Sequence, residues 1–267
     1  MYIGTHTGTS IKSAQLIYEH GGNLIQIFVS GDNNSKYKEL KKYLDDHQMK
    51  CVVHASYTIN LSRDWDQYSG MIQQFILEIT RAHLMGAFGI VIHMGKQMEL
   101  DLPDAYNNMY TALIYVHHQT IKYNSVKILL ETSTGQGSEI CYKIEELAYF
   151  FKKFSRNNKA NIASRFGICL DTCHVFAAGY NLVTKSAVYS YLEAFEELIG
   201  LRHLYLVHLN DSKREVGSNV DRHENIGKGK IGKDGLLEVA KYFKNLKIPI
   251  ILETPGDYIL EDLKMIL

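Results

Sequence analysis

The sequence predicts an α/β fold: a single (β/α)₈ TIM barrel spanning residues 1–267, with a metal site at the C-terminal mouth of the strands. Three observations point to this fold. The length suits one barrel of this class. Eight short apolar runs alternate with helix-length periodic segments, and metal-binding residue types follow most of the runs. A doubly wound open sheet has the same alternation, but its Gly-rich dinucleotide turn after the first strand is absent.

The eight expected strands are short and rich in Ile, Val and Leu, as buried parallel strands are. Most are too short to form free-standing helices. In chain order they cover Tyr2–Gly4, Leu24–Val29, Cys51–Val53, Gly89–Ile92, Lys127–Leu130, Gly167–Leu170, Leu204–Val207 and Ile248–Leu252.

The segments between the strands have the spacing of amphipathic helices. Ser10 is placed to cap the first helix, and Gly21 and Gly22 are placed to end it. Gly86 is placed to end a long helix that begins near residue 64. The remaining helices are expected at about 104–123, 140–156, 184–199 and 233–244, with a shorter one at the C-terminus.

Composition excludes several classes of protein. The 46% hydrophobic and 22% charged residues are ordinary for a globular chain, and 29 basic residues balance 29 acidic ones. No global field therefore attracts nucleic acid or an anionic membrane, so any DNA binding must be local. The four cysteines form no C-x-x-C pair, and the chain shows neither a signal peptide nor a membrane span. We therefore expect a soluble intracellular protein.

Residues that can bind a metal follow each apolar run from the third to the eighth. They are His54, His93, Glu131, Asp171, His208 and Glu253, spaced 37 to 45 residues apart. Composition alone would produce six such hits in roughly 0.4% of cases. Because the C-terminal ends of barrel strands form one mouth, we expect these side chains to converge there. His6 and Ser30 follow the first two runs, and His6 is expected beside the ligands rather than among them.

Two further groups extend this set on the loops behind the sixth and seventh strands. His174 follows in Asp171-Thr-Cys-His174, while Asp221 and His223 share Asp221-Arg-His223. Nine candidates are too many for one ion, and they suit two or three ions with a bridging carboxylate. Mixed imidazole and carboxylate ligands favour Zn²⁺, Mn²⁺ or Fe²⁺ over Ca²⁺ or Mg²⁺.

Not every candidate residue type belongs to this site. Cys173 lies beside the cluster, but its neighbours already supply enough ligands, so we do not expect it to bind metal. Glu131 and Glu253 end Ile- and Leu-rich strands, where a carboxylate is costly unless it is paired or metal-bound. Six histidines lie on expected helices or their ends and are interpreted as ordinary core or surface residues: His20, His47, His83, His117, His118 and His203.

Motifs along nearly the whole chain carry a resemblance to a known family. They read His54-Ala-Ser-Tyr57-Thr-Ile-Asn60, Ile92-His93-Met-Gly95, Leu130-Glu131-Thr-Ser-Thr-Gly-Gln-Gly137, Asp171-Thr-Cys-His174-Val-Phe-Ala-Ala-Gly179-Tyr180, His208-Leu-Asn-Asp-Ser-Lys213, Asp221-Arg-His223 with Gly227-Lys-Gly-Lys-Ile-Gly232, and Leu252-Glu253-Thr-Pro255. The sequence resembles the endonuclease IV family of apurinic/apyrimidinic (AP) endonucleases.

The resemblance implies a TIM barrel with three Zn²⁺ ions, some of whose sites can take Mn²⁺ or Fe²⁺. By motif, His54, His93 and Glu131 would hold the first ion. Glu131 would bridge to a second ion, completed by Asp171, His208 and Glu253, and would position the hydroxide nucleophile. The third ion would be held by His174, Asp221 and His223. The implied reaction is hydrolysis of the phosphodiester 5′ to an abasic site, leaving a 3′-hydroxyl and a 5′-deoxyribose phosphate.

The resemblance also implies a substrate, double-stranded DNA that contains abasic sites, bound by a monomer. Tyr57 matches a family residue that inserts at the lesion. The family usually carries an Arg wedge after the second strand, whereas this loop has no Arg, and Asn33 falls near that position. Thr58 replaces a larger apolar residue. In the mixed-charge segment 211–235, Lys213 and Arg222 are candidate phosphate contacts.

Two other functions remain open from the sequence. A sugar isomerase or epimerase on a related barrel would also place Glu, Asp and His at strand ends, but it would not need the group of His174, Asp221 and His223. A catalytically silent protein that binds damaged DNA would gain little from nine intact ligands. Both alternatives are therefore less favoured than the nuclease.

Overall fold

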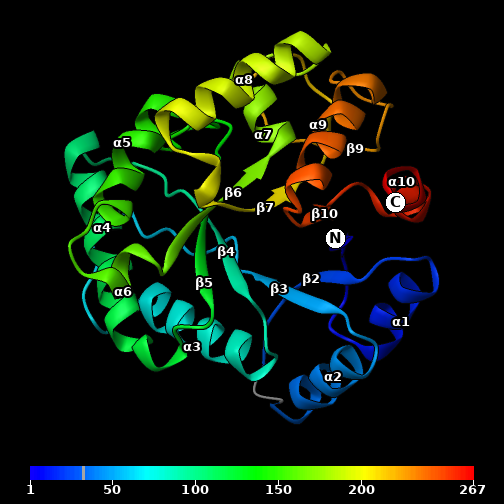
Figure 1. Cartoon of the computed structure of the whole chain (residues 1–267). Coiled ribbons are helices and arrows are strands. Elements are labelled where there is room, and N and C mark those ends of the chain that lie inside the picture. The colour runs from blue at the N-terminus through cyan, green and yellow to red at the C-terminus, as the bar shows by residue number, and fades with distance from the viewer. Residues whose placement is uncertain (32–33) are drawn as a thin grey trace.

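The structure is a computed structural model that describes residues 1–31 and 34–267. The described part of the chain forms a closed barrel of eight parallel strands, with helices around its outside (Figure 1). Around the barrel the strands follow chain order, and the last closes onto the first. The predicted (β/α)₈ TIM barrel is therefore confirmed. Barrel strands are β1 (Ile3–His6), β2 (Leu24–Phe28), β3 (Lys50–His54), β4 (Gly89–His93), β5 (Lys127–Glu131), β6 (Phe166–Asp171), β7 (Leu204–His208) and β10 (Ile250–Leu252).

Most predicted strand boundaries are correct to within one or two residues. The start of the last strand, β10, shows why they are not exact. The expected strand began at Ile248, whereas β10 begins at Ile250. Pro249 lies between them and has no N–H to donate to a strand ladder. Its carbonyl still accepts from the Val207 N–H at 3.0 Å, so regular pairing begins only after the proline.

The helices pack around the barrel, and the predicted start of the first is confirmed because the Ser10 side chain accepts from the Ser13 N–H at 3.1 Å. The helices are α1 (Ile11–Glu19), α2 (Asn34–Asp46), α3 (Gly70–Leu84), α4 (Leu102–Gln119), α5 (Ile144–Ser155), α6 (Ala160–Ala163), α7 (Thr172–Ala177), α8 (Lys185–Leu198), α9 (Lys233–Leu246) and α10 (Ile259–Ile266). Three 3₁₀ turns cover Ile121–Tyr123, Leu201–His203 and Gly256–Tyr258, and a two-stranded ribbon joins β8 (Asp211–Ser212) to β9 (His223–Glu224).

Several helices differ from the sequence prediction, and two of the differences have a clear local cause. The helix expected from about residue 64 begins at Gly70, because Asp66 and Ser69 form a local turn instead. In that turn the Tyr68 N–H donates to Asp66 Oδ1 and the Asp66 N–H donates to Ser69 Oγ, each at 2.9 Å. The segment after Asp171 was expected as a loop, but it forms the short helix α7, which Asp171 caps through the His174 N–H.

Along each strand, the side chains that face the barrel interior change from apolar to polar within two residues. Below the mouth lies an interior cluster of buried side chains, namely Leu24, Val52, Val91, Leu129, Cys169, Leu206 and Ile251, and Gly4 holds the corresponding place on β1. Side chains two residues apart on a strand share a face. The next inward positions are therefore those of the mouth set: His6, Gln26, His54, His93, Glu131, Asp171, His208 and Glu253. For the second strand this residue is Gln26, not the predicted strand-end residue Ser30.

Among the described residues, no helix combines the length and the apolar character that crossing a membrane requires.

Gly4 tests how tightly this interior is closed. A Cβ at Gly4 would lie 1.6 Å from the Leu24 carbonyl oxygen on the neighbouring strand. Because both groups are backbone or fixed to it, we expect Gly4→Ala to destabilise the protein by about 1–3 kcal/mol, or to prevent folding. Gly70→Ala is the matched control, since its Cβ would meet no atom within 4 Å. Guanidinium denaturation measures both changes, and equal midpoints would contradict the packing described here.

Candidate metal centre

The nine side chains predicted to bind metal gather at one mouth of the barrel. Five of them, His54, His93, Glu131, Asp171 and His208, end barrel strands, and Glu253 directly follows β10. His174 comes from α7, and Asp221 and His223 come from the excursion that includes β9. Three sets drawn wholly from these nine side chains have ligand atoms close enough together to share an ion: His54, His93 and Glu131; Glu131, Asp171, His208 and Glu253; and Asp171, His174 and His223. Two further sets include a cysteine: Cys169 with Glu131 and His208, and Cys173 with Asp221 and His223.

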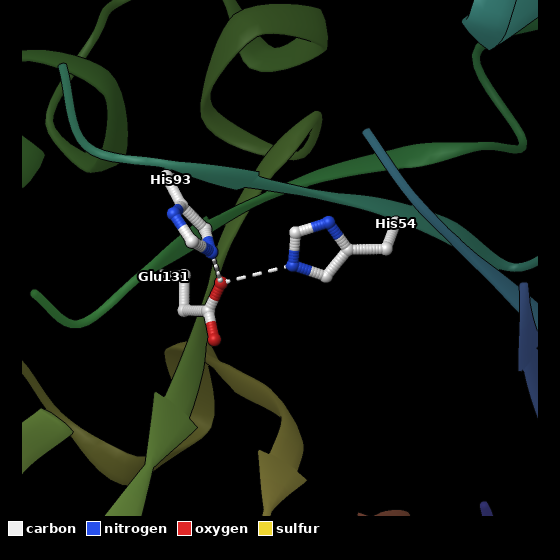
Figure 2. Close-up of side chains that lie close together, drawn as sticks. All are labelled: His54, His93 and Glu131. Carbon is white, nitrogen blue, oxygen red and sulfur yellow. Dashed lines mark hydrogen bonds and ion pairs between the residues drawn. The ribbon is translucent and has the colours of Figure 1, made fainter. Parts of the chain in front are cut away.

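The buried carboxylate of Glu131 lies at the centre of the site. Its Oε2 is 3.3 Å from His54 Nε2 and 3.0 Å from His93 Nε2, and Figure 2 shows both imidazoles turned toward this oxygen. On the other side, Oε1 is 2.8 Å from His208 Nδ1 and 3.7 Å from His174 Nδ1. The two oxygens of Glu131 thus face different histidines, which is the arrangement a bridging carboxylate requires.

The second set of ligand atoms surrounds His208. Its Nδ1 lies 3.1 Å from Glu253 Oε2 and 3.9 Å from Asp171 Oδ2. Asn210 ties these two carboxylates together, since its Nδ2 donates to Asp171 Oδ2 at 2.6 Å and its Oδ1 accepts from the Glu253 N–H at 2.8 Å. Both acidic side chains are therefore held in place from behind.

The third set, beside which Asp221 lies, links α7 to the excursion after β7. Asp221 lies between two imidazoles, with Oδ2 3.3 Å from His174 Nε2 and Oδ1 3.3 Å from His223 Nε2. Gln136 positions Asp221 by accepting its backbone N–H at 2.8 Å. His223 Nε2 also lies 3.5 Å from Asp171 Oδ2, so this set adjoins the second.

The hydrogen bonds on the far side of the imidazoles show that a cation fits here. His54 Nδ1 donates to the Ala55 carbonyl at 2.7 Å, His174 Nδ1 to the Thr132 carbonyl at 2.8 Å, and His223 Nδ1 to the Glu253 carbonyl at 3.3 Å. In a neutral imidazole the remaining Nε2 then carries a lone pair toward the carboxylates. Nε2 of His174 and of His223 is buried and makes no hydrogen bond among the described residues, although both lie within ion-pairing distance of Asp221. Metal ligands have this pattern.

The electrostatics of the protein without bound metal follow from this crowding. Burial alone would lower the pKa of His54 and His174, but the carboxylates of Glu131, Asp171 and Asp221 outweigh it, and both pKa values are raised. Burial alone would raise the pKa of Glu131, yet the nearby His93 and His208 hold it well below its usual range.

Of the other residues considered in the sequence analysis, Cys173 and His6 lie near this site, whereas the six histidines interpreted as ordinary do not belong to it. Cys173 lies near Asp221 and His223, but burial raises the pKa of its thiol to about 12, which keeps it neutral. His6 faces the mouth, with Nδ1 3.5 Å from Glu253 Oε1. The six histidines interpreted as ordinary are helical or adjacent to a helix, and none belongs to a ligand group found among the described residues.

Two of the predicted DNA contacts, Tyr57 and Arg222, line the outer part of the mouth. A cavity of about 320 Å³ beside the ligands is lined by Tyr57, Asn60, His93, Lys96, Asp221 and Arg222, among others. Tyr57 is 65% exposed, and its ring centroid lies 5.2 Å from those of His54 and His93. Lys213 lies 4.0 Å from Glu224. Asn33 lies outside the described residues, so its predicted contact stays a prediction.

Sequence reasoning missed three amide side chains that support the ligands: Gln26, Asn210 and Gln136. Gln26 offered a signal, since it is a polar residue inside an apolar strand, at a position that faces the barrel interior. Asn210 and Gln136 lie in loops, where an amide is too common a residue to attract notice.

Comparison with known proteins supplies relatives across the whole chain. A profile described as a xylose isomerase-like TIM barrel matches residues 14–266. A protein named probable endonuclease 4 from Chlorobium phaeobacteroides is 34% identical over 269 residues, covering 95% of this chain and 92% of the relative. The apurinic-apyrimidinic endonuclease 1 of Plasmodium falciparum is 36% identical over 232 residues, covering 85% of this chain and 37% of that longer relative.

Two solved structures share the fold with equal TM-scores. Endonuclease IV from Thermus thermophilus superposes with a TM-score of 0.75 at 25% identity, covering 98% of this chain and 95% of that chain. A D-tagatose 3-epimerase-like protein also reaches a TM-score of 0.75, at 20% identity, with 100% and 95% covered. The second likeness shows a shared barrel alone.

Binding of zinc should release protons at neutral pH. The pKa of His174 and of His208 is raised well above the usual histidine range by the surrounding carboxylates, which favours an extra proton on both imidazoles in the absence of metal. An incoming ion must displace such protons, so we expect net proton release on binding at pH 7, and less release as the pH rises through the raised pKa values. Calorimetric titration in two buffers of different protonation enthalpy measures this release. Identical binding enthalpies in both buffers would contradict it.

Proposed function

Because the chain belongs to the endonuclease IV family of AP endonucleases, within the xylose isomerase-like TIM barrels, we propose that it cuts double-stranded DNA at abasic sites. The proposed reaction is hydrolysis of the phosphodiester 5′ to the lesion, which leaves a 3′-hydroxyl and a 5′-deoxyribose phosphate. The observation that carries this proposal is the convergence of nine metal-type ligands around a carboxylate with differently oriented oxygens.

The proposal assigns the ligands to three ions, with zinc as the expected metal and Mn²⁺ or Fe²⁺ as alternatives in some sites. His54, His93 and Glu131 would hold the first ion, and Glu131, Asp171, His208 and Glu253 the second. The third would be held by His174, Asp221 and His223. Support for the first two ions comes from the grouping of the ligand atoms. Support for the third comes from Asp221, which lies 3.3 Å from both imidazoles, and from the buried Nε2 atoms of His174 and His223, which lack a hydrogen bond within the described chain.

In this mechanism the protein supplies position and shape. Bound zinc-type ions lower the pKa of water and neutralise charge on phosphoryl oxygens. Glu131 orients the attacking water, whose oxygen forms a bond to phosphorus as the bond to the 3′-oxygen breaks and that oxygen takes up a proton. Tyr57 and Arg222 line the cavity that would hold the abasic sugar and its phosphate. Selectivity arises because a nucleotide without a base is less costly to extrude from the duplex.

Side chains on the outer rim of the mouth would make the contacts with the rest of the DNA. We assign insertion at the lesion to the exposed ring of Tyr57, and phosphate contacts to Arg222 and Lys213. A DNA substrate places the activity in the compartment that holds the DNA. A monomer suffices, since all nine proposed ligands come from one chain.

The sugar isomerase or epimerase alternative shares the barrel but explains less of the site. Such an enzyme has no need for the set of His174, Asp221 and His223, in which Asp221 here lies 3.3 Å from both imidazoles. A silent DNA-binding protein has no need for any of the nine. The nuclease is therefore the function that accounts for the whole cluster.

Incision of a duplex with one tetrahydrofuran abasic analogue tests the reaction. We expect the zinc-loaded protein to cut 5′ to the analogue and leave a 3′-hydroxyl, and Glu131→Gln to slow cutting at least about 100-fold because the bridge and the water position are lost. Glu99→Gln is the matched control, since Glu99 is exposed and lies outside the site. Gel analysis of end-labelled products measures both. A fully loaded wild type that does not cut, or a folded Glu131→Gln that cuts at the normal rate, would refute the mechanism.

Tyr57 is expected to act in binding rather than in the chemical step. Loss of its stacking surface in Tyr57→Ala should raise KM for the abasic duplex about 10-fold while kcat changes less, and Tyr57→Phe should remain close to wild type. Tyr68→Ala controls for loss of an exposed tyrosine from the same loop region, since Tyr68 is 79% exposed. Steady-state kinetics separate the two constants. An unchanged KM in Tyr57→Ala would remove this tyrosine from the DNA interface.

A further inference from the structure

Gln26 is the one amide in the mouth set, and it is fully buried on β2. Its carboxamide contacts three other members of that set. Nε2 lies 2.6 Å from Glu253 Oε1 and 3.1 Å from His6 Nδ1, and Oε1 lies 2.8 Å from His208 Nε2. The side chain therefore spans the interior from β2 to β7 and to the residue after β10.

The carboxylate of Glu253 decides which way the amide points. An ionised carboxylate can only accept hydrogen bonds, so the atom of Gln26 that faces it must be the NH₂ group. The amide oxygen is then the atom that faces His208. Since this oxygen can only accept, His208 must carry a proton on Nε2.

This proton fixes the orientation of His208 relative to the metal. With Nε2–H bound to Gln26, the ring presents Nδ1 to Glu131 Oε1 at 2.8 Å and to Glu253 Oε2 at 3.1 Å. His54, His174 and His223 have the opposite arrangement, because backbone carbonyls accept from their Nδ1 atoms. Of these four histidines, His208 is the one whose orienting hydrogen bond, among the described residues, goes to a side chain.

The barrel explains why a side chain is needed. His208 Nε2 points into the interior, toward β2, where the backbone groups are engaged in the ladders with β1 and β3. A strand carbonyl cannot turn inward without breaking its ladder. A buried amide at position 26 supplies the missing acceptor.

We propose that Gln26 is a positioning residue that holds His208 in the Nε2–H tautomer, so that this histidine binds the second ion through Nδ1 while the other ligand imidazoles bind through Nε2. This inference rests on the proposed metal binding of the same site. Gln26 acts through His208 and Glu253 and touches neither the ion nor the DNA.

The test replaces Gln26 by Met, which keeps the volume and removes both hydrogen-bonding groups. We expect the dissociation constant for one zinc ion, measured by competition with a chelator, to rise about 10- to 100-fold. We also expect the zinc-loaded wild type to show one histidine bound through Nδ1 in long-range ¹⁵N NMR spectra, and Gln26→Met to lose that signal. Thr5→Val is the control, since Thr5 is equally buried and lies on the adjacent strand.

Gln26→Glu keeps an acceptor for His208 and gives a second reading should Gln26→Met fail to fold. In the folded Glu variant, His208 should still bind through Nδ1. Wild-type zinc affinity and spectra in Gln26→Met, or loss of the Nδ1 signal in Gln26→Glu, would overturn the proposal. Neither readout uses DNA, so a loaded wild type that does not cut abasic duplex would refute the proposed function and leave this inference standing.

Discussion

The structure depends on one buried carboxylate. Glu131 is 1% exposed and has imidazoles on both sides, and an uncompensated charge at that depth would cost several kcal/mol. The Glu131 charge is compensated only if β3, β4 and β7 end at the same level along the barrel axis, because His54, His93 and His208 are the last residues of those strands. Compensation also requires α7 to begin directly after β6, so that His174 turns back toward the site. The register of half the barrel is thus tied to the site at its mouth.

Much of this could be predicted from the sequence because the information is local. Short apolar runs identified the strands, and the residues that follow them identified His54, His93 and Glu131. What could not be predicted was which positions face inward and what supports them. Ser30 follows the second apolar run, yet Gln26 is the residue that faces the ligands, because inward direction depends on the pleat and the shear of the barrel rather than on where hydrophobicity stops. The backbone carbonyls that accept hydrogen bonds from the histidines could not be predicted, because every residue type has such a carbonyl.

The candidate metal centre takes its ligands from two kinds of structure. Some lie on the rigid barrel strands, and others lie on the long ordered segment after β7. Ligands on the strands are fixed by the barrel itself, whereas Asp221 and His223 belong to a long segment with only the β8–β9 ribbon for regular structure. Asp211 organises this segment, since its buried carboxylate accepts the backbone N–H groups of Gly227, Gly229, Ile231 and Gly232. Barrels that share the fold can therefore keep the strand ligands and differ in this excursion, which is where a function can diverge.

Under the proposed function, the charge that attracts DNA would be a property of the metal-loaded site rather than of the chain. The protein is formally neutral, and on the rim Lys213 lies near Glu224 while Lys230 pairs with Glu215 at 2.7 Å. Among the nine proposed ligands, four are carboxylates, and three divalent ions would outweigh them by two charges. That positive charge lies in a recess next to Tyr57, where low-dielectric walls focus its field on a phosphate that enters the cavity. Under the proposed function, the electrostatic attraction and the selection for an extrudable nucleotide would therefore act at the same place.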